Sequence, residues 1–568
     1  MQASARTLTP GAPAPGVGAS AETMRNAEQL LTDHLGASVV HRYAPEPIGD
    51  QLYLAVNDSD RRQVDGRTVL LCWWPGCDRP PTRAMHDRKG RVAVCEQHWP
   101  NIARRSVDIH STLIARAADP AYTEWSRRAA SAGGCANPVR LQRQTSSLDP
   151  STGELSPVVD DTRSDGVIYK GCGNRRAEVC PACAGVYRAD AFQLVLAGLR
   201  GGKGIPDAVA GHPAIFATLT GPSFGLVHTR RTDKNDQVLP CRPRRRAQAC
   251  KHGVVLRCRH THGKEDPRLG QPLCADCYDY NGHAVWNAWA GELWRRTRIA
   301  VDRAITRHQP DGAPPVRISY GKAAEMQHRG LIHYHGVLRL DGVDPDDRDA
   351  VIAPPAWASV FVLAHALREA FTATRFITPP HPDRATGWLM HWGDSGKGLD
   401  LKPIRHAADA EISREQVAGY LAKYSTKSTE TTGHVSKKLH PDTVDLYADD
   451  SHPGRIIDAC WTLGRPEAGE DWARLRRWAH QLGYGGHFFT KSRRYTATFK
   501  AVRAARRTWI RSQADLDTEH TNAAQVTVTT WAFLGIGWRT TGDALLAQTS
   551  AALAREHRRM AREEILSA

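Results

Sequence analysis

The stretch "AEMQHRGLIHYHGVLRL" (residues 324–340) most constrains the fold, because it carries the pattern of a β-hairpin. Its second half alternates between two faces, which is typical of a strand. The residues before it can form the partner strand, and "HRG" at 328–330 is a three-residue loop that ends in glycine. In that register Glu325 lies opposite His333, so Glu325, His333 and His335 share one face of a sheet. Two imidazoles and a carboxylate suit a divalent cation with open positions for water and phosphate oxygens. The alternative is a solvated face on which Glu325 is an ion-pair partner of the histidines.

A second stretch, "SREQVAGYLAKYSTKSTE" (residues 413–430), predicts a helix that begins with a serine and a glutamine in capping-box spacing. Tyr420 and Tyr424 lie one turn apart on one face of that helix. Lys423 and Lys427 each follow a tyrosine by three positions. A tyrosine hydroxyl can attack a phosphodiester if a metal polarises the phosphate and cations stabilise the developing charge. The alternative is an amphipathic helix whose tyrosines only pack.

Thirteen cysteines, most of them clustered, favour metal sites over disulfides, because the N-terminus lacks the apolar segment of a secretory signal. The Cys-x-x-Cys and Cys-x-x-His spacings are typical of tetrahedral structural zinc. Scattered core cysteines or a redox pair explain this clustering less well. We expect about three Zn²⁺ ions: one at Cys72, Cys77, Cys95 and His98, one at Cys172, Cys180 and Cys183 with Cys135 as the nearest fourth ligand, and one at Cys250, Cys258, Cys274 and Cys277, where Cys241, His252 and His262 compete as ligands.

The length and charge of the chain indicate several domains and a polyanionic partner. A chain of 568 residues is too long for one ordinary hydrophobic core, and its formal net charge is +16. No run of 18 apolar residues exists, so we expect no membrane span, and nucleic acid becomes the better partner. The basic, aromatic-containing stretch 488–511 suits single-strand contacts, although a solvated helix face is the alternative. Its candidate DNA-binding residues are Lys491, Arg493, Arg494, Arg503, Arg506 and Arg507.

These motifs together resemble the HUH endonucleases that start rolling-circle replication. The strand "IFATLT" (215–220) is similar to their first motif, "HYH" (333–335) to their second, and "YLAKYSTK" (420–427) to the tyrosine helix of two-tyrosine phage initiators. Several relatives carry a glutamate that Glu325 matches. The chain looks still more like the large replication initiators of actinobacterial plasmids and integrative conjugative elements, from about residue 130 to 500. Stretches that carry this resemblance include "CGNRRAEVCPAC", "GQPLCADCYDY" and "AHQLGYGGHFFTKSRRY".

The resemblance implies an α+β fold, in which a central antiparallel sheet is flanked by helices and carries small zinc-binding modules and a helical C-terminal region. The tyrosine helix would pack across the sheet, with Mg²⁺ or Mn²⁺ at Glu325, His333 and His335. The expected domains are a disordered or weakly ordered tail (1–65), a zinc-binding module (66–130), a second zinc-binding module (131–195), an HUH endonuclease domain (196–430) with a zinc-binding insertion at about 241–280, and a basic, mainly helical C-terminal region (431–568).

The implied activity is that of a cytoplasmic bacterial replication initiator. It would nick one strand of its origin through Tyr424 or Tyr420, assisted by Lys423 and Lys427. The products would be a 5′-phosphotyrosyl enzyme and a free 3′-OH, and DNA would later be rejoined. Its partners would be double- and single-stranded origin DNA, a host helicase and a polymerase. Two alternatives are a two-tyrosine rolling-circle transposase or relaxase, and a non-catalytic, zinc-containing DNA-binding regulator.

Overall fold

The computed structural model of the chain describes residues 112–148, 155–157, 167–246, 248–404, 412–427, 429, 432, 438–515 and 526–567, with short strands between residues 46 and 95. The expected N-terminal tail therefore lies mostly outside the described residues. The chain divides into two compact units. The smaller one contains residues 1–173, 179–183 and 521–568, and the larger one contains residues 174–178 and 184–520. Among the described residues, no helix is both long and apolar enough to cross a membrane.

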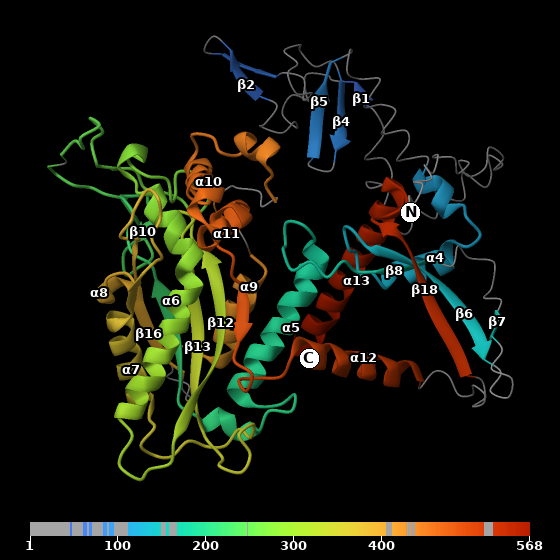
Figure 1. Ribbon diagram of the computed structural model, residues 1–568. Coiled ribbons are helices and arrows are strands. Elements are labelled where there is room, and N and C mark those ends of the chain that lie inside the picture. The colour runs from blue at the N-terminus through green and yellow to red at the C-terminus, as the bar shows by residue number, and fades with distance from the viewer. Residues whose placement is uncertain are drawn as a thin grey trace, which may run out of the picture. The chain divides into compact units, whose positions relative to one another are not determined.

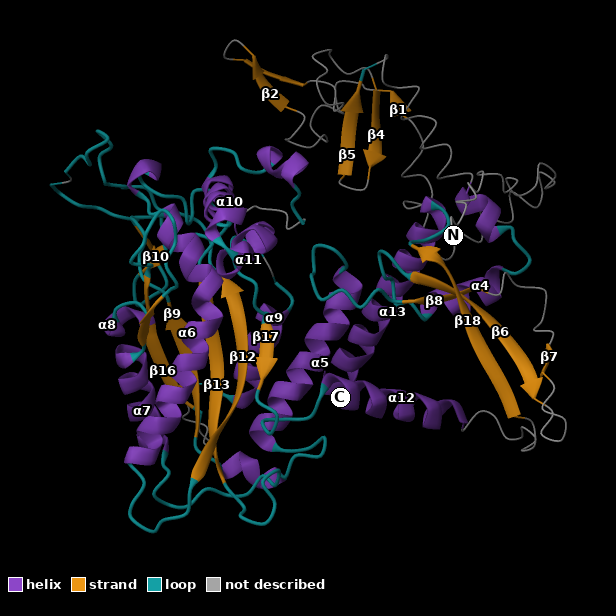
Figure 2. Cartoon of the chain, in the orientation of Figure 1, coloured by secondary structure: helices purple, strands orange, loops and turns teal. Residues whose placement is uncertain are grey.

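The larger unit is built on a five-stranded antiparallel sheet, which Figure 2 shows in the order β16, β9, β13, β12, β17. The central hairpin pairs β12 (Val316–Met326) with β13 (Ile332–Gly342). β9 (Ala214–Thr220) lies on the other side of β13 and pairs in turn with β16 (Leu399–Pro403). β17 (Phe489–Lys491) completes the other edge beside β12.

Helices cover both faces of this sheet, because alternate residues of its strands are apolar on both sides. The core on one face is formed with α6 (Tyr280–Arg307), α7 (Val360–Ala373), α10 (His452–Leu463) and α11 (Glu470–Trp478). The core on the other face joins Phe216 and Val337 to α5 (Pro181–Arg200) and α9 (Arg414–Ser425). Figure 1 shows α6 crossing the sheet beside β13. The hairpin is therefore a middle layer with a helix layer on each side.

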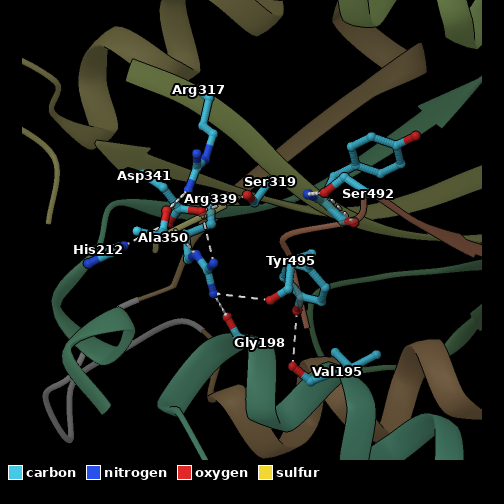
Figure 3. Close-up of polar contacts among 11 residues, drawn as sticks. Val195, Gly198, His212, Arg317, Ser319, Arg339, Asp341, Ala350, Ser492 and Tyr495 are labelled. Atoms are coloured by element: carbon cyan, nitrogen blue, oxygen red, sulfur yellow. Dashed lines mark hydrogen bonds and ion pairs between the residues drawn. The ribbon is translucent and has the colours of Figure 1, made fainter. Parts of the chain in front are cut away.

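A buried ionic network fastens the hairpin end that is remote from the histidines, as Figure 3 shows. Arg339 and Asp341 are both 0% exposed and are joined at 2.7 and 2.9 Å. Asp341 also accepts from Ser319 Oγ at 2.6 Å and pairs with His212 Nδ1 at 2.8 Å. Arg339 donates to the carbonyl oxygen of Gly198 at the end of α5. The network therefore ties both strands of the hairpin to α5.

The smaller unit contains a separate sheet and core. β6 (Val139–Leu148) pairs with β18 (Val526–Ile536), β7 (Leu155–Pro157) and β8 (Val167–Lys170). Residues of α4 (Tyr122–Ala130) and α13 (Thr541–Ser567) share its apolar core.

The remaining strands and α-helices of the two units are β1 (Glu46–Pro47), β2 (Arg61–Val64), β3 (Arg67–Leu70), β4 (Arg83–Asp87), β5 (Gly90–Val94), β10 (Arg231–Thr232), β11 (Val238–Leu239), β14 (Arg375–Ile377), β15 (Leu389–His391), α8 (Ser395–Gly398) and α12 (Phe499–Asp515).

The C-terminal residues do not form the single region that was expected over 431–568. Strand β17 and helices α10 and α11 belong to the larger unit, whereas β18 and α13 belong to the smaller one. The physical reason is that these segments complete sheets and cores begun much earlier in the chain. Such long-range pairing leaves no local signal in the sequence. The mixed α and β composition with antiparallel sheets agrees with the expected fold class.

Candidate active site and metal clusters

The β12–β13 hairpin has the register that its sequence predicts. Glu325 lies opposite His333, and Ala323 lies opposite His335. His335 Nε2 is 2.8 Å from Glu325 Oε2. This contact is a hydrogen bond within an ion pair, as the alternative interpretation of the sequence expects. Its length is also close to the roughly 2.9 Å between two adjacent ligands that each lie about 2.05 Å from an octahedral ion, so the pair could hold a hard divalent cation. The possible ligand atoms of Glu325, His333 and His335 do not all lie within 4.8 Å of one another, unlike those of the Cys/His clusters described below. The centres of the two histidine rings are nevertheless 4.5 Å apart. Sharing one ion therefore requires a small side-chain movement.

Two threonines on β9 hold the far edges of the histidine rings. Thr218 Oγ1 is 3.2 Å from His335 Nδ1, and Thr220 Oγ1 is 3.0 Å from His333 Nδ1. Histidines that bind metals usually donate their second ring N–H to such a partner, and Thr218 can accept one from His335. His333 Nδ1 also lies 3.1 Å from the amide nitrogen of Gln327, which is a hydrogen-bond donor. Burial, reinforced by the neighbouring His335 and Arg329, lowers the pKa of His333 to about 3. His333 is therefore a neutral imidazole at neutral pH, the state in which it can bind a metal.

Helix α9 brings both tyrosines over the histidine side of the sheet. The capping box predicted for its start is present, with Ser413 and Gln416 bonding to each other's backbone N–H. The Tyr420 ring lies 4.8 Å from the His335 ring, and the Tyr424 ring stacks on it at 5.2 Å. Tyr420 is 36% exposed, whereas Tyr424 is 8% exposed. The two hydroxyl groups therefore share one site but differ in their access to solvent.

Neither tyrosine ionises readily in this structure. Burial raises the pKa of Tyr420. Burial also raises the pKa of Tyr424, as do its hydrogen bonds to Tyr420 and Glu325 and the nearby negative charge. The ammonium groups of Lys423 and Lys427 lie 5.6 and 5.5 Å from the centre of the Tyr424 ring. Both ammonium groups therefore lie close to the ring of the second tyrosine.

The segment Asn174–Glu178 stabilises the C-terminal end of α9. Arg175 donates to the carbonyl oxygens of Ser425 and Lys427 at 3.2 and 2.8 Å. Its guanidinium also lies over the Phe488 ring at 4.3 Å. Carbonyl groups at the end of a helix lack intrahelical partners and carry partial negative charge, so an arginine is favourable there.

The first fully described cysteine cluster brings Cys135 together with Cys172, Cys180 and Cys183, all ligand atoms lying within 4.8 Å of one another. Cys180 Sγ and Cys135 Sγ are 3.8 Å apart. Two sulfurs bound at about 2.3 Å in a tetrahedron would also be about 3.8 Å apart. Backbone N–H groups of Cys172 and Ala136 donate to these sulfurs. The spacing and the donors fit zinc, and Cys135 occupies the fourth position despite the long loop.

The third cysteine group separates into two clusters in the structure. Cys250, Cys274 and Cys277 gather around His252, while Cys258 lies instead with Cys241, His228 and His262. His228 Nδ1 is 3.3 Å from His262 Nε2, and Cys258 Sγ is 3.5 Å from the same nitrogen. Tetrahedral zinc with bonds of about 2.0–2.3 Å gives about 3.3 and 3.6 Å for such pairs. The expected grouping of Cys258 with Cys250 therefore differs from the structure, because the loop between them folds back.

Of the N-terminal zinc group, Cys72, Cys77 and His98 lie outside the described residues, and Cys95 is buried. Three described clusters could thus bind a metal such as zinc, where the sequence predicted two in this part of the chain. A further group, His308, His365 and Glu369, is exposed. Its Glu369 already forms an ion pair with Arg307.

Most of the candidate DNA-binding cations are already engaged. Arg493 and Arg494 both pair with Asp349 at 2.8 Å. Arg503 and Arg506 both pair with the fully buried Asp190, so they neutralise a core carboxylate. The Lys491 ammonium group donates to the Thr496 carbonyl at 2.8 Å. Arg507 is exposed, and among the described residues it has no ion-pair partner.

Several residues of the site escaped the sequence reasoning. His228 has no spacing signal, because it precedes its nearest fellow ligand by 13 positions. Thr218 and Thr220 look like ordinary strand residues, although their period of two matches that of the histidines. The one usable signal was Cys258-x-x-x-His262, a spacing that is typical of a zinc knuckle.

Comparison with known proteins gives the family. A model of the family described as "Replication initiator protein, pSAM2" matches residues 121–552. A curated "Replication initiator protein" from Streptomyces ambofaciens is 36% identical over 472 residues, which cover 80% of this chain and 95% of the relative. No solved structure matches the chain significantly. This chain belongs to the pSAM2-type replication initiator family.

Proposed function

We propose that this replication initiator is an HUH-type endonuclease and strand transferase, which nicks one strand of its origin through a tyrosine. The observation that carries the proposal is the placement of the Tyr420 and Tyr424 rings 4.8 and 5.2 Å from the ring of His335, which itself pairs with Glu325. The proposal is supported by two tyrosines that lie over the same face of the sheet as the histidine pair and Glu325.

Glu325, His333 and His335 would hold Mg²⁺ or Mn²⁺, which when bound supplies Lewis-acid polarisation of a phosphate oxygen. The chain's own groups perform the transfer. A tyrosine oxygen loses its proton and bonds to phosphorus, the bond from phosphorus to the 3′-oxygen breaks, and the departing 3′-oxygen gains a proton. Lys423 and Lys427 stabilise the charge of this transition state. The products are a 5′-phosphotyrosyl protein and a 3′-OH end, and attack by a 3′-OH on that linkage reverses the reaction without ATP.

Tyr424 is proposed as the first nucleophile. The carboxylate of Glu325 is close enough to raise the pKa of Tyr424, and the ammonium groups of both lysines lie within 6 Å of the centre of its ring. The more exposed Tyr420 would act second, on the regenerated origin, and thereby release a circle. A transposase or relaxase would use the same two tyrosines, so the substrate distinguishes these functions: the initiator acts on the double-strand origin of its own element. We also propose that the Cys/His clusters hold structural zinc. A host helicase would unwind the nicked DNA, and a host polymerase would extend its 3′-OH end.

The test uses a labelled single-strand origin oligonucleotide with Mg²⁺ and a denaturing gel that retains covalent adducts. Tyr420→Phe and Tyr424→Phe each remove only a hydroxyl, and Tyr187→Phe on α5 is the control. We expect each single mutant still to form an adduct through its remaining tyrosine, with the larger loss in Tyr424→Phe, and the double mutant to form none, while the control behaves as wild type. On an origin plasmid, neither single mutant should complete circle release. An adduct of normal yield in the double mutant would refute tyrosine catalysis at α9 and favour another nucleophile, whereas the absence of any adduct from the wild type would favour the non-catalytic regulator.

A further inference from the structure

The turn between β12 and β13 is held from several sides, unlike an ordinary exposed hairpin loop. Asn287 on α6 donates to the Gly330 carbonyl at 2.8 Å and accepts from the Ile332 N–H at 2.9 Å. His452 Nε2 on α10 donates to the Arg329 carbonyl at 2.9 Å. Most backbone groups at a hairpin tip bond to water, so these contacts fix the position of the turn.

Side chains of the turn extend to the histidine pair. Arg329 Nε donates to Gln327 Oε1 at 3.0 Å, and Gln327 Nε2 is 3.1 Å from His333 Nδ1. Thr220 approaches the same nitrogen at 3.0 Å. The position of the turn therefore sets the direction of the His333 ring, which shares its face of the sheet with Glu325 and His335.

Gly270, which is paired with the zinc-ligand candidate His228, packs directly against this turn. Gly270 donates to the His228 carbonyl at 2.9 Å, and His228 donates to the Gln271 carbonyl at 2.9 Å. Gly270 has φ +83°, and a Cβ atom there would lie 2.3 Å from the His328 carbonyl carbon and 2.5 Å from Arg329 N. The two backbones touch, so only glycine fits. Arg329 also donates to the carbonyl of Pro222 at 3.2 Å, and Pro222 shortly precedes His228 in the chain.

The cluster of His228, Cys241, Cys258 and His262 has the partners of a metal centre as well as the spacing. Asp266 Oδ2 is 2.8 Å from His262 Nδ1, which directs His262 Nε2 toward Cys258 and His228. The Thr229 N–H donates to Cys241 Sγ at 3.2 Å. A carboxylate on the second nitrogen of a histidine ligand and an N–H on a thiolate are typical of zinc sites.

We propose that a zinc ion at His228, Cys241, Cys258 and His262 positions the catalytic histidine. The ion holds the pairing of His228 with Gly270 and Gln271 against the hairpin turn, and Arg329 and Gln327 pass that position on to His333. These two residues are positioning residues, since they act through His333. The inference rests on the proposed function, because it assigns the zinc centre a role in the divalent-ion site of the nuclease.

The experiment measures Mn²⁺ binding by electron paramagnetic resonance titration of the full-length protein, together with zinc stoichiometry and thermal unfolding. Gly270→Ala changes the contact with the turn but no zinc ligand. Gly253→Ala is the matched control, because Gly253 also has positive φ (+78°) but its Cβ would meet no atom within 4 Å. His262→Ala removes a ligand directly. Disturbing a partner of a metal ligand typically weakens metal binding about 10–100-fold.

We expect Gly270→Ala to keep all its zinc and to raise the Kd for Mn²⁺ about tenfold or more, while Gly253→Ala leaves that Kd within about twofold of wild type. His262→Ala should lose one zinc and show the same weakening. The inference is overturned if Gly270→Ala binds Mn²⁺ as wild type does, or if both glycine variants weaken Mn²⁺ binding equally. These outcomes can be read even if the His262→Ala protein does not fold. His333→Ala distinguishes a failure of the proposed function from a failure of the zinc inference. If His333→Ala leaves Mn²⁺ binding unchanged, the proposed function fails. If it abolishes Mn²⁺ binding, the glycine variants test the zinc inference alone.

Discussion

The two halves of the candidate active site are held in different ways. The histidine hairpin is a middle layer with helices on both faces, fixed at one end by the Arg339–Asp341 network and at the other by Asn287 and His452. The tyrosine helix is capped at both ends, but it presents Tyr420 with 36% of its surface exposed. In the proposed reaction, the metal ligands must hold one ion, whereas two nucleophiles must each reach a strand and release it. The difference suggests that rigidity belongs to the hairpin and access to the helix.

The largest effect should come from the hairpin. His335→Ala or His333→Ala removes a proposed ligand of the divalent ion, so we expect nicking to fall by at least about a thousandfold while the protein stays folded. A gel assay of nicking over a range of Mg²⁺ or Mn²⁺ measures the effect, and circular dichroism checks folding. Nicking at the wild-type rate by the double histidine variant after chelator treatment would contradict a metal role for the hairpin.

The second effect concerns the stability of the hairpin. Asp341→Asn leaves the buried Arg339 without its counter-charge, which should cost about 3–5 kcal/mol in the free energy of unfolding. Asp302→Asn is the control, since its ion pair with Arg298 lies near the surface and should cost at most about 1 kcal/mol. Burial alone would raise the pKa of Asp341, but hydrogen bonds from His212, Arg339 and Ser319 lower it.

The same carboxylate gives a pH dependence with a definite sign. Because the folded-state pKa of Asp341 is lowered, its contribution to stability is present above the ordinary carboxyl pKa of 3.8 and is lost as the pH falls through the lower folded value. Denaturant unfolding of wild type and Asp341→Asn between about pH 3 and 7 should show their difference shrinking at the acid end. A gap that grows on acidification would contradict the network as described.

A smaller effect should come from the helix end. Arg175→Ala removes the donor that bonds the Ser425 and Lys427 carbonyls, so the last turn of α9 should fray and the adduct rate should fall by about 10-fold. Hydrogen exchange of the peptide spanning 412–427 measures the fraying, with the exposed Arg188→Ala of α5 as the control. Unchanged exchange and unchanged adduct rate would show that the helix needs no support from this segment.

The smallest effect should come from the start of the helix. Ser413→Ala removes the capping box of α9 and should cost about 1 kcal/mol of stability, with a modest fall in adduct rate. Ser359→Ala removes the equivalent cap of α7 and should cost about as much without slowing the adduct. Equal effects of the two variants on adduct formation would mean that general destabilisation, not the position of α9, is being measured.

Local patterns explain what the sequence could predict. The register of Glu325 against His333 followed from period-two alternation and a loop ending in Gly330, and the capping box from Ser413 and Gln416. Contacts between distant segments explain the rest. The sequence gives no sign that Asp190 and Asp349 pair with four of the candidate DNA-binding arginines, or that Cys258 leaves its neighbours for His228. Each depends on a loop closure or on helix packing that only the folded chain reveals.

In the proposed reaction, a tyrosine of α9 becomes covalently joined to the 5′-phosphate of the nicked origin. The most direct measurement is to incubate the protein with a supercoiled origin plasmid and Mg²⁺, digest both DNA and protein, and locate the nucleotide by mass spectrometry. The account predicts a phosphotyrosyl nucleotide on Tyr424 or Tyr420, within the peptide 412–427. Nicking with no covalent peptide, or an adduct on a residue outside α9, would contradict it.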